Sequence, residues 1–529
     1  MSDLFLITTA DERSWKIDKN SLFLGEWCKL FSRKHIWKDL DYKTLPYHWD
    51  DRKKYYKDYI YLSEVYQQYI NEIAQSLNTI HGINCSVRYW KIVIGPWLRF
   101  FIDVVYDRYS SIKSAIETKI VTSTLIMSSD IINWIPKDYN QFYKSFTTDQ
   151  WNHMIYSEII KIMDVLSYEL IDQKNDPDCN FNKKNNYRIF SKLKNNVVNT
   201  YARILPDRFN SIFFTSSYFD LKNLVKLQLK MGQLPYLSGP VIEIKDIFVN
   251  KNLRKQLKLN LQKNEFSRIL DLIIPMQIPK CYIEGFDQLI SLVKKYYPKQ
   301  VKSIYTANAY SHDDVFKVWA GYQVEKNNKL FIGQHGGNLG VCLWSQREDH
   351  QIEVSDKYFS WGWTDEKYDN IKPMSAGKLL IIKNKIDSNI SGDILSVLPS
   401  FPRYFYCSFS MPISAQFLDC IDGQIELTKL LSTKSLKQYK IRLDSTDFGW
   451  DTLGRFYNKG LIGNIDMKNT KLIDRIKESK LCLIPHNATV FLETFTANFP
   501  TVLFWNPDLY ELRESAKPYY DLLHQVGIL

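Results

Sequence analysis

Hydrophobic and polar positions follow one another along this chain in blocks that predict strands and helices. The run 4–9 (LFLITT) is short and apolar and is followed by polar residues, and the run 21–25 (SLFLG) repeats that pattern. Short, uninterrupted apolar runs are typical of strands that are buried on both faces of a parallel sheet. The chain therefore begins with two predicted buried strands, each followed by a polar loop.

Between about residues 50 and 205 the pattern changes to the helical period. The stretch 61–82 spaces its apolar residues three and four apart and ends in His81-Gly82, which is a typical helix ending. The stretch 89–117 is also mostly helical, with a break at Gly95-Pro96. We therefore predict a long helical insertion over about 50–205, and we predict a solvated loop over its most polar part, 172–188.

Strand signals return in the second half of the chain. Apolar runs predict strands within 210–218, 302–311 and 329–337, with a helix over 312–327. A second series predicts strands at 357–363, 378–383, 403–409, 439–443, 480–486 and 501–507, with helices over 469–480 and 489–498. Strands that alternate with helices form parallel sheets with right-handed crossovers. We predict an α/β fold of two Rossmann-like, doubly wound domains that face a cleft, residues 1–350 with the helical insertion and residues 351–529.

Composition adds a basic charge to this picture. The chain is 45% hydrophobic and 24% charged, as globular proteins are, and its formal net charge is +11. A basic excess favours polyanionic partners, namely phosphorylated substrates, nucleic acid or an anionic membrane surface. The 34 Tyr, 29 Phe and 14 Trp fill cores, and such residues also line sugar and base sites.

Several motif classes are absent from the sequence. The eight cysteines include no C-x-x-C pair and no zinc spacing, so we expect reduced thiols in the cytoplasm and no metal site. No signal peptide opens the chain, and no window of 18 residues lacks charges, so no transmembrane helix is predicted. No Walker A loop, dinucleotide fingerprint or nucleophile elbow appears. Lysine and arginine are dispersed rather than clustered, which disfavours nucleic acid as a partner.

Ligands bind beyond the carboxyl ends of parallel strands, so polar residues that follow the predicted strands are the candidate site residues. In chain order they are Glu26, Trp27, Asn308, Gln334, His335, Gly336, Gly337, Asn338, Arg442, Asp447, His486, Asn487, Thr489 and Glu493.

The segment that runs from His486 to Glu493 predicts an anion site. Asn487 or Thr489 can cap the helix that follows, and the free backbone N–H groups and dipole at a helix start attract a phosphate. His486 can donate to that phosphate, and Glu493 can accept from ribose hydroxyls. The alternative is that Thr489 is only a cap and Glu493 only a partner of the helix dipole.

Glu26 and His335 are the predicted catalytic residues. A neutral histidine at a strand end can act as a general base or can hold an acidic group of the donor, and the glycines that follow it allow close approach of a ligand. The alternative for His335 is a tight turn with a satisfied histidine. Glu26 can serve as a catalytic carboxylate with Trp27 as a sugar platform, or only as a charge at a helix start. Arg442 is either a structural ion pair or a clamp on a phosphate or carboxylate.

Six segments of the chain together resemble a family of bacterial O-antigen and surface-carbohydrate transferases. They are FLITTADERSW…LFLGEWC, YWKIVIGPWLRFFIDVVYDR, TANAYSHDDVFKVWAGY, GQHGGNLG, DFGWD and LETFTANFPTVLFWNPDLYELRESAKPYYDLL, and the resemblance runs from residue 3 to the C-terminus. The order of strand-end motifs is more remotely similar to that of capsule and lipopolysaccharide transferases that use CMP-activated ulosonic acids, and to that of CDP-glycerol glycerophosphotransferases. Both groups have the GT-B arrangement.

This resemblance implies a metal-independent glycosyltransferase of bacterial surface polysaccharide biosynthesis, without a cofactor. The donor is expected to be a CMP-linked ulosonic or nonulosonic acid, bound by Gln334, Gly336, Gly337, Asn338, Arg442, Asp447, His486, Asn487, Thr489 and Glu493. Trp27 and Asn308 are expected to bind a glycan or lipid-linked acceptor. The expected location is the cytoplasm, at the anionic inner face of the membrane. GT-B proteins often have a further C-terminal helix, so the resemblance leaves open whether the natural chain continues beyond Leu529.

One position departs from the pattern of those relatives. They often carry a His-Pro pair where this chain has Asp444-Ser445, which leaves the donor nucleotide open. The alternatives are transfer of glycerol phosphate or of a hexose from another nucleotide, a nucleic-acid-binding protein, and a non-catalytic relative that keeps the scaffold.

Overall fold

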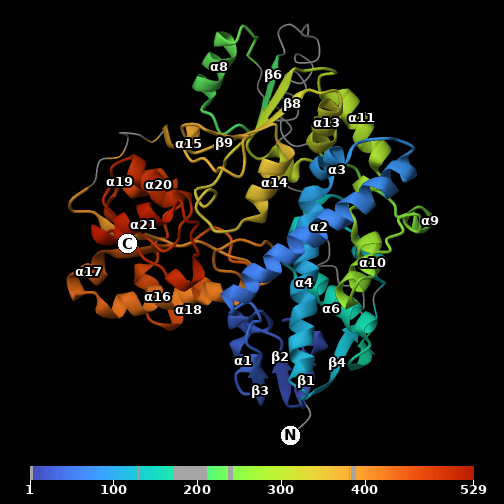
Figure 1. The fold of residues 1–529 in the computed structure, drawn as a ribbon. Helices are drawn as coiled ribbons and strands as arrows, with labels where there is room; N and C mark the ends of the chain where they lie inside the picture. The colour runs from blue at the N-terminus through green and yellow to red at the C-terminus, as the bar shows by residue number, and fades with distance from the viewer. Residues whose placement is uncertain are drawn as a thin grey trace.

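The computed structural model describes residues 4–128, 130–171, 211–235, 242–380, 382, 386 and 389–529. Within these residues the strands form three parallel sheets (Figure 1), which confirms the α/β class. The sequence predicts two Rossmann-like series, so the structure has one sheet more. The loop predicted over 172–188 lies outside the described residues.

The first sheet has the strand order β3-β2-β1-β4-β5. Its strands are β1 (Leu4–Ile7), β2 (Ser21–Phe23), β3 (Tyr42–Thr44), β4 (Val121–Met127) and β5 (Ser167–Ile171). Both strands predicted at the start of the chain are therefore present. However, β4 and β5 lie inside 50–205, so the stretch predicted as a helical insertion also contains two strands of the first sheet. Strand β4 is a short run with β-branched residues between helical segments, and the helical periodicity of the surrounding sequence does not distinguish it.

The second sheet has the order β10-β9-β8-β7-β6. Its strands are β6 (Ile212–Thr215), β7 (Ser303–Thr306), β8 (Lys329–Gly333), β9 (Lys357–Ser360) and β10 (Ile371–Pro373). Strands β8 and β9 pair directly, with Phe331 opposite Lys357. The boundary predicted between residues 350 and 351 therefore falls between two adjacent strands of one sheet.

The third sheet has the order β12-β11-β13-β14. Its strands are β11 (Asp393–Val397), β12 (Tyr439–Arg442), β13 (Ser479–Ile484) and β14 (Thr501–Leu503). Strand β11 is missing from the prediction, and two predicted strands are wrong. Residues 377–380 form the short helix α15 (Gly377–Leu380), and 403–409 is buried irregular chain rather than a strand.

Helix boundaries follow local signals closely. Helix α2 (Arg52–His81) begins after Asp51, whose side chain accepts from two backbone N–H groups, and ends at Gly82 in the left-handed conformation, with φ of 62°. Helices α3 (Val87–Val93) and α4 (Gly95–Glu117) are separated at the predicted break.

The remaining named α-helices of the described residues surround these sheets. They are α1 (Lys34–Trp37), α5 (Tyr139–Ser145), α6 (Asp149–Met163), α8 (Leu221–Lys230), α9 (Lys251–Arg254), α10 (Glu265–Gln277), α11 (Phe286–Tyr296), α12 (Ala309–His312), α13 (Asp314–Glu325), α14 (Gln346–Val354), α16 (Phe417–Leu430), α17 (Thr433–Gln438), α18 (Thr452–Asn458), α19 (Leu472–Lys477), α20 (Thr489–Thr496) and α21 (Lys517–Gln525).

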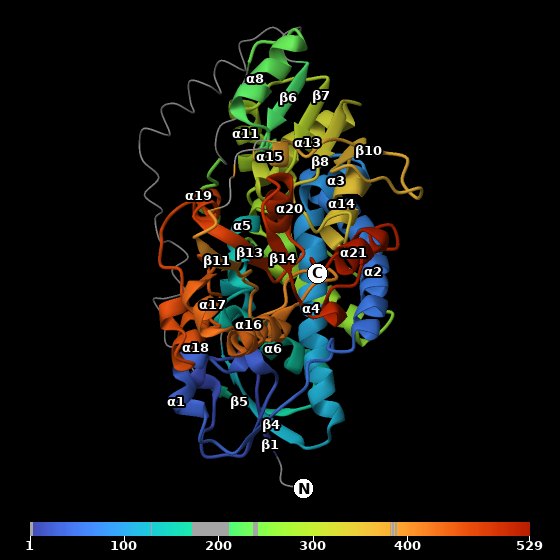
Figure 2. The same cartoon turned by 90° about the vertical axis from the view of Figure 1, so that its left-hand side faces the viewer.

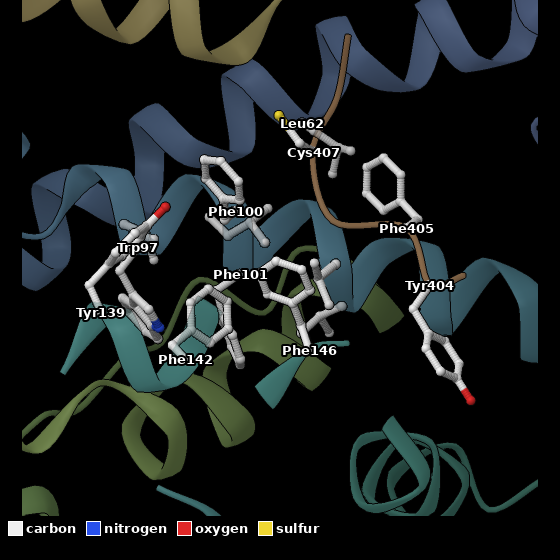
Figure 3. Close-up of a cluster of buried hydrophobic side chains, with 14 of the residues drawn as sticks. Leu62, Trp97, Phe100, Phe101, Tyr139, Phe142, Phe146, Tyr404, Phe405 and Cys407 are labelled. Atoms are coloured by element: carbon white, nitrogen blue, oxygen red, sulfur yellow. The ribbon is translucent and has the colours of Figure 1, made fainter. Parts of the chain in front are cut away.

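Helix α4 runs through the middle of the molecule, between the first sheet at one end and the second sheet at the other (Figures 1 and 2). Trp97, Phe100 and Phe101 on this helix pack among Phe142 of α5 and Phe405 of the 403–409 segment (Figure 3). A helix with buried residues on every face belongs to the interior of a protein. The aromatic run 403–409 is therefore buried by helices rather than by pairing in a sheet.

The same helix also buries charges. Arg108 is fully buried and donates to the Asp107 carboxylate at 2.6 Å and to the Phe405 carbonyl at 3.0 Å. One turn before Asp107, Asp103 is fully buried, and its carboxylate lies 3.4 Å from Arg99 Nε. Burial raises the pKa of Asp103 to about 6, although Arg99 offsets part of that effect.

Replacing this buried carboxyl should change how stability depends on pH. The folded-state pKa of Asp103 lies above its unfolded value, so its contribution to stability is present at low pH and is lost as pH rises through about 6. Asp103→Asn does not titrate. The free energy of unfolding of Asp103→Asn minus that of the parent should therefore rise by about 2 kcal/mol between pH 4 and pH 7. Urea unfolding across that pH range measures the difference, and a difference independent of pH would contradict the assignment.

Candidate functional site

The loop after β8 is shaped by one buried side chain. Gln334 Nε2 donates to the Gly336 carbonyl at 2.7 Å and to the Leu339 carbonyl at 2.8 Å. Its Oε1 accepts from the Trp361 backbone N–H at 2.7 Å and from Trp363 Nε1 at 2.8 Å. These four bonds use both the nitrogen and the oxygen of the amide, so Gln334 holds the loop in place. A bound nucleotide-sugar would therefore contact other residues of the loop rather than the Gln334 side chain.

This loop, which follows β8 of the second sheet, contacts the first turn of α20, the helix that follows β13 of the third sheet. The Gly337 N–H donates to Thr489 Oγ1 at 3.1 Å. A Cβ atom at Gly337 would lie 3.0 Å from Thr489 Cα and 3.1 Å from the Ala488 carbonyl carbon. Only a residue without a side chain allows the two backbones to approach so closely. The residues predicted at 334–338 and at 486–493 therefore come together in space.

The start of α20 has no side-chain cap. The N-cap residue is Ala488, so the prediction that Asn487 or Thr489 caps the helix is wrong. His486 Nδ1 accepts from the Ala488 N–H at 3.1 Å, which leaves the ring proton on Nε2, and burial lowers the pKa of His486 to about 4. Asn487 is fully buried, and within the described part of the chain neither polar atom of its side chain has a hydrogen-bond partner. Uncapped N–H groups beside an unpartnered amide suit an anion.

Glu493, on α20, forms an ion pair with a lysine of another helix. Its Oε1 lies 2.8 Å from Lys378 Nζ, and Lys378 is on α15. The lysine side chain is 37% exposed, so solvent screens part of this ion pair. Asn338 is half-buried, and its carbonyl accepts from the backbone N–H groups of Val341 and Cys342, which closes the loop.

His335 lies on the other side of this loop among aromatic rings. Its ring centroid is 6.4 Å from that of Tyr218, with the planes nearly parallel, and 6.4 Å from that of Tyr310. Nδ1 is buried without a hydrogen-bond partner among the residues the structure describes. Burial lowers the pKa of His335 to about 4, with a further contribution from Arg347, so the ring is neutral at pH 7.

Tyr218 links His335 to another predicted residue. Asn308 Nδ2 donates to the Tyr218 hydroxyl at 3.3 Å. Tyr218 has a φ of 58°, and Ser216, two residues before it, has a φ of 44°. Non-glycine residues with left-handed backbones are uncommon and often occur at functional sites.

The two predicted residues of the first sheet do not join this group. Glu26 lies at the end of β2 and accepts from Lys29 Nζ at 2.7 Å. Trp27 is only 2% exposed, and its Nε1 donates to the Thr8 carbonyl at 3.2 Å, so its role as a sugar platform is corrected to that of a core residue. The first sheet lies at the opposite end of the molecule from the second sheet, which holds His335 (Figures 1 and 2).

Arg442 and Asp447 have structural partners in the third sheet. Arg442 Nη1 lies 3.3 Å from the Asp466 carboxylate, and Nη2 donates to the Thr470 carbonyl at 2.5 Å. The structure thus shows the ion pair that was one of the two alternatives for Arg442. Asp447 accepts from the Thr452 N–H at 3.2 Å, and burial raises the pKa of its carboxyl.

Three residues of this region are absent from the prediction. Tyr218 follows β6 and could have been found by the strand-end rule, because 210–218 is predicted as a strand. Lys378 lies on a helix that the sequence predicts as a strand, and Arg347 lies on α14 with no distinguishing local pattern. Only tertiary contacts identify Lys378 and Arg347.

Among the described residues, no group of three or more His, Cys, Asp or Glu side chains is arranged to hold a metal ion. None of the helices in that part of the chain combines the length and the apolar character needed to cross a bilayer.

Comparison with known protein families gives a match over nearly the whole chain. The model of a family described as LIC12162 family transferase matches residues 4–529. No curated protein matches the chain. The matched range includes all three sheets and every candidate residue discussed above.

The close approach at Gly337 generates a direct test. Gly337→Ala would place a methyl group against the backbone of Ala488 and Thr489, and overpacking of this kind costs about 1–3 kcal/mol. Gly336→Ala is the matched control, because its Cβ would meet only the Asn338 side-chain oxygen, at 3.1 Å, which can move. Urea unfolding should show a clear loss for Gly337→Ala and a smaller change for Gly336→Ala. Equal losses would show that the close approach is not what requires glycine.

Proposed function

The chain belongs to the LIC12162 family of transferases, and from that premise we propose that it is a glycosyltransferase of bacterial surface polysaccharide biosynthesis. The observation that carries this proposal is the meeting of the His335 loop with the uncapped start of α20. In this proposal the second and third sheets are the two Rossmann-like halves of a GT-B arrangement. The donor nucleotide binds on the third sheet and the acceptor on the second.

The start of α20 is the proposed phosphate site. In this proposal its free N–H groups and the Nε2–H of His486 donate hydrogen bonds to the phosphate of the nucleotide. Such donors stabilise the negative charge of the phosphate as it leaves. Asn487 adds an amide that has no partner among the described residues. Glu493 is placed one turn into the helix, where its carboxylate can accept from ribose hydroxyls while Lys378 holds it. The sequence resemblance makes a CMP-linked ulosonic or nonulosonic acid the first choice of donor.

His335 is the proposed proton acceptor. In the transfer, an acceptor hydroxyl oxygen bonds to the anomeric carbon of the donor while the bond from that carbon to the phosphate oxygen breaks. The hydroxyl proton goes to the imidazole, and the nucleotide leaves with the bonding electrons. A neutral ring with a free Nδ1 suits this role. Tyr218 and Asn308 are proposed to hold the acceptor, whereas Glu26, which follows a strand of the first sheet, has no part in this step.

Nucleotide binding tests the donor site. The protein is titrated calorimetrically with CMP, CDP, UDP, GDP and dTDP. We expect selective binding of cytidine nucleotides and at least tenfold weaker binding by Glu493→Ala. Glu426→Ala is the matched control, because Glu426 also pairs with a lysine, Lys429, at 2.5 Å, but on the distant helix α16. Its affinity should equal that of the parent.

The other outcomes of this titration separate the alternatives. Binding of a nucleotide without cytidine would support the proposed transferase activity. It would contradict the CMP-linked acidic sugar as the donor and would favour a nucleotide-linked hexose. Tighter binding of CDP than of CMP would favour transfer of glycerol phosphate, because that donor carries two phosphates and leaves CMP behind. If no nucleotide binds, the proposed donor site is wrong and a non-catalytic scaffold is favoured.

Helix α8 supports peripheral contact with the anionic cytoplasmic face of the inner membrane. This helix lies beside β6 at one end of the molecule (Figure 1), and Leu224 anchors it to the small cluster around Phe214. Its outer surface exposes leucines and lysines together, namely Leu221, Leu227, Leu229, Lys222, Lys226 and Lys230, and Met231 follows them. Basic amphipathic helices of this kind lie in the headgroup region of anionic bilayers.

Vesicle binding tests this contact. The double variant Leu227→Glu/Leu229→Glu should co-sediment several-fold less with phosphatidylglycerol vesicles than the parent does. Leu430→Glu is the control, because Leu430 is also an exposed leucine but lies on α16. Parent binding should also weaken as salt rises, because the lysines act through the surface potential. Binding that is indifferent to salt and to the double variant would contradict α8 as the docking element.

A further inference from the structure

Arg347 on α14 is a charged group without a counter-ion. Its guanidinium lies over the rings of Phe100 and Tyr406, with Cζ 5.3 Å and 5.6 Å from the ring centroids. No carboxylate among the described residues forms an ion pair with it, and its Nε is buried without a hydrogen-bond partner there. The side chain as a whole is half-buried.

Among the described residues, the groups around Arg347 include no acid that could neutralise its charge. They are the aromatic side chains already named together with Tyr139, Tyr143 and Tyr310, the thiol of Cys407 and the imidazole of His335. Burial raises the pKa of Cys407 to about 11, so its thiol is neutral at pH 7. The positive charge of Arg347 is therefore uncompensated and lies close enough to His335 to lower the pKa of that ring.

Two further buried polar atoms, His335 Nδ1 and Gln351 Oε1, lie beside Arg347. Gln351 is close enough to His335 to raise the pKa of the ring, against the lowering effect of burial. Gln351 is one helical turn after Arg347, and its Nε2 donates to the Arg347 carbonyl at 2.8 Å. Buried polar atoms are nearly always satisfied, so the unpartnered Nε of a guanidinium that has no acidic partner among the described residues indicates a site that a ligand completes.

We propose that Arg347 binds an anionic oxygen group of a substrate, a carboxylate or a phosphate, next to His335. The planar guanidinium matches both groups through paired N–H donors, and Phe100 and Tyr406 hold its plane fixed. This inference rests on the proposed function, because it supplies the acidic group that the reaction carries past His335. The source is either the carboxylate of an ulosonic-type donor or the phosphate of a lipid-linked acceptor.

Calorimetry with two simple anions tests this site. The protein is titrated with N-acetylneuraminic acid, which carries the carboxylate, and with inorganic phosphate. Each titration is run with and without excess CMP, so that an anion bound at the start of α20 is displaced and not counted. We expect one anion to bind the CMP-saturated protein, with at least tenfold weaker binding by Arg347→Gln. Arg268→Gln, which removes an exposed arginine on α10, should bind as the parent does.

The conservative variant separates anion binding from structural packing. Arg347→Lys keeps the charge and its place over the rings but loses the paired donors, so its affinity should fall less than that of Arg347→Gln. If the thermal melting curve shows that Arg347→Gln does not fold, the affinity of Arg347→Lys is compared with that of the parent instead. Binding of the sugar acid assigns the site to the donor, and binding of phosphate alone assigns it to the acceptor.

Two outcomes would overturn the proposal. One is that neither anion binds the parent protein, and the other is that folded Arg347→Gln and Arg347→Lys bind it as the parent does. Failure of the donor site is a separate result, since CMP would then not bind the parent at all, whatever the anions do. Loss of anion binding in Arg347→Gln with CMP binding retained would support both sites independently.

Discussion

The burial of helix α4 on every side is the constraint on which the rest of the structure depends. A helix in that position must place its charged side chains inside the protein, and α4 does so by pairing Arg108 with Asp107 and Arg99 with Asp103. Unpaired charges in that interior would be strongly destabilising. The same helix leads directly into β4 of the first sheet and packs on α14 beside the second sheet. It therefore holds the two sheets apart and at a set distance.

The candidate site is built where the second and third sheets meet. Its parts come from the ends of β6, β7, β8 and β13, and the close approach of Gly337 to α20 joins them. One side of that contact is polar and suits a phosphate. The other side is aromatic, around His335, and contains the uncompensated charge of Arg347. A nucleotide-linked sugar likewise has an anionic phosphate and a sugar ring. We therefore treat the polar side and the aromatic side as two parts of one candidate site.

Residues that follow strands were found from the sequence because the rule behind them is local. His335, Gly337, Asn308, His486 and Thr489 all lie where apolar runs end, and the structure brings them to one region. The same rule also selected residues of the first sheet, Glu26 and Trp27, which lie elsewhere. A run of sequence shows that a strand ends, but it does not show which sheet the strand joins. Sheet membership depends on pairing between distant segments, as with β8 and β9 on either side of the predicted boundary.

The sequence by itself determined the α/β class, most strands, the ends of α2 and the break before α4, because periodicity and capping are interactions between near neighbours. Only the tertiary structure decided that the described strands form three sheets, that Trp27 and 403–409 are core, that Arg442 pairs with Asp466, and that Arg347 has no counter-ion within the described part of the chain. Each of these depends on burial and on charges that meet across large separations in the chain. Such contacts leave no local pattern, since the partners are brought together only when the helices and sheets have packed.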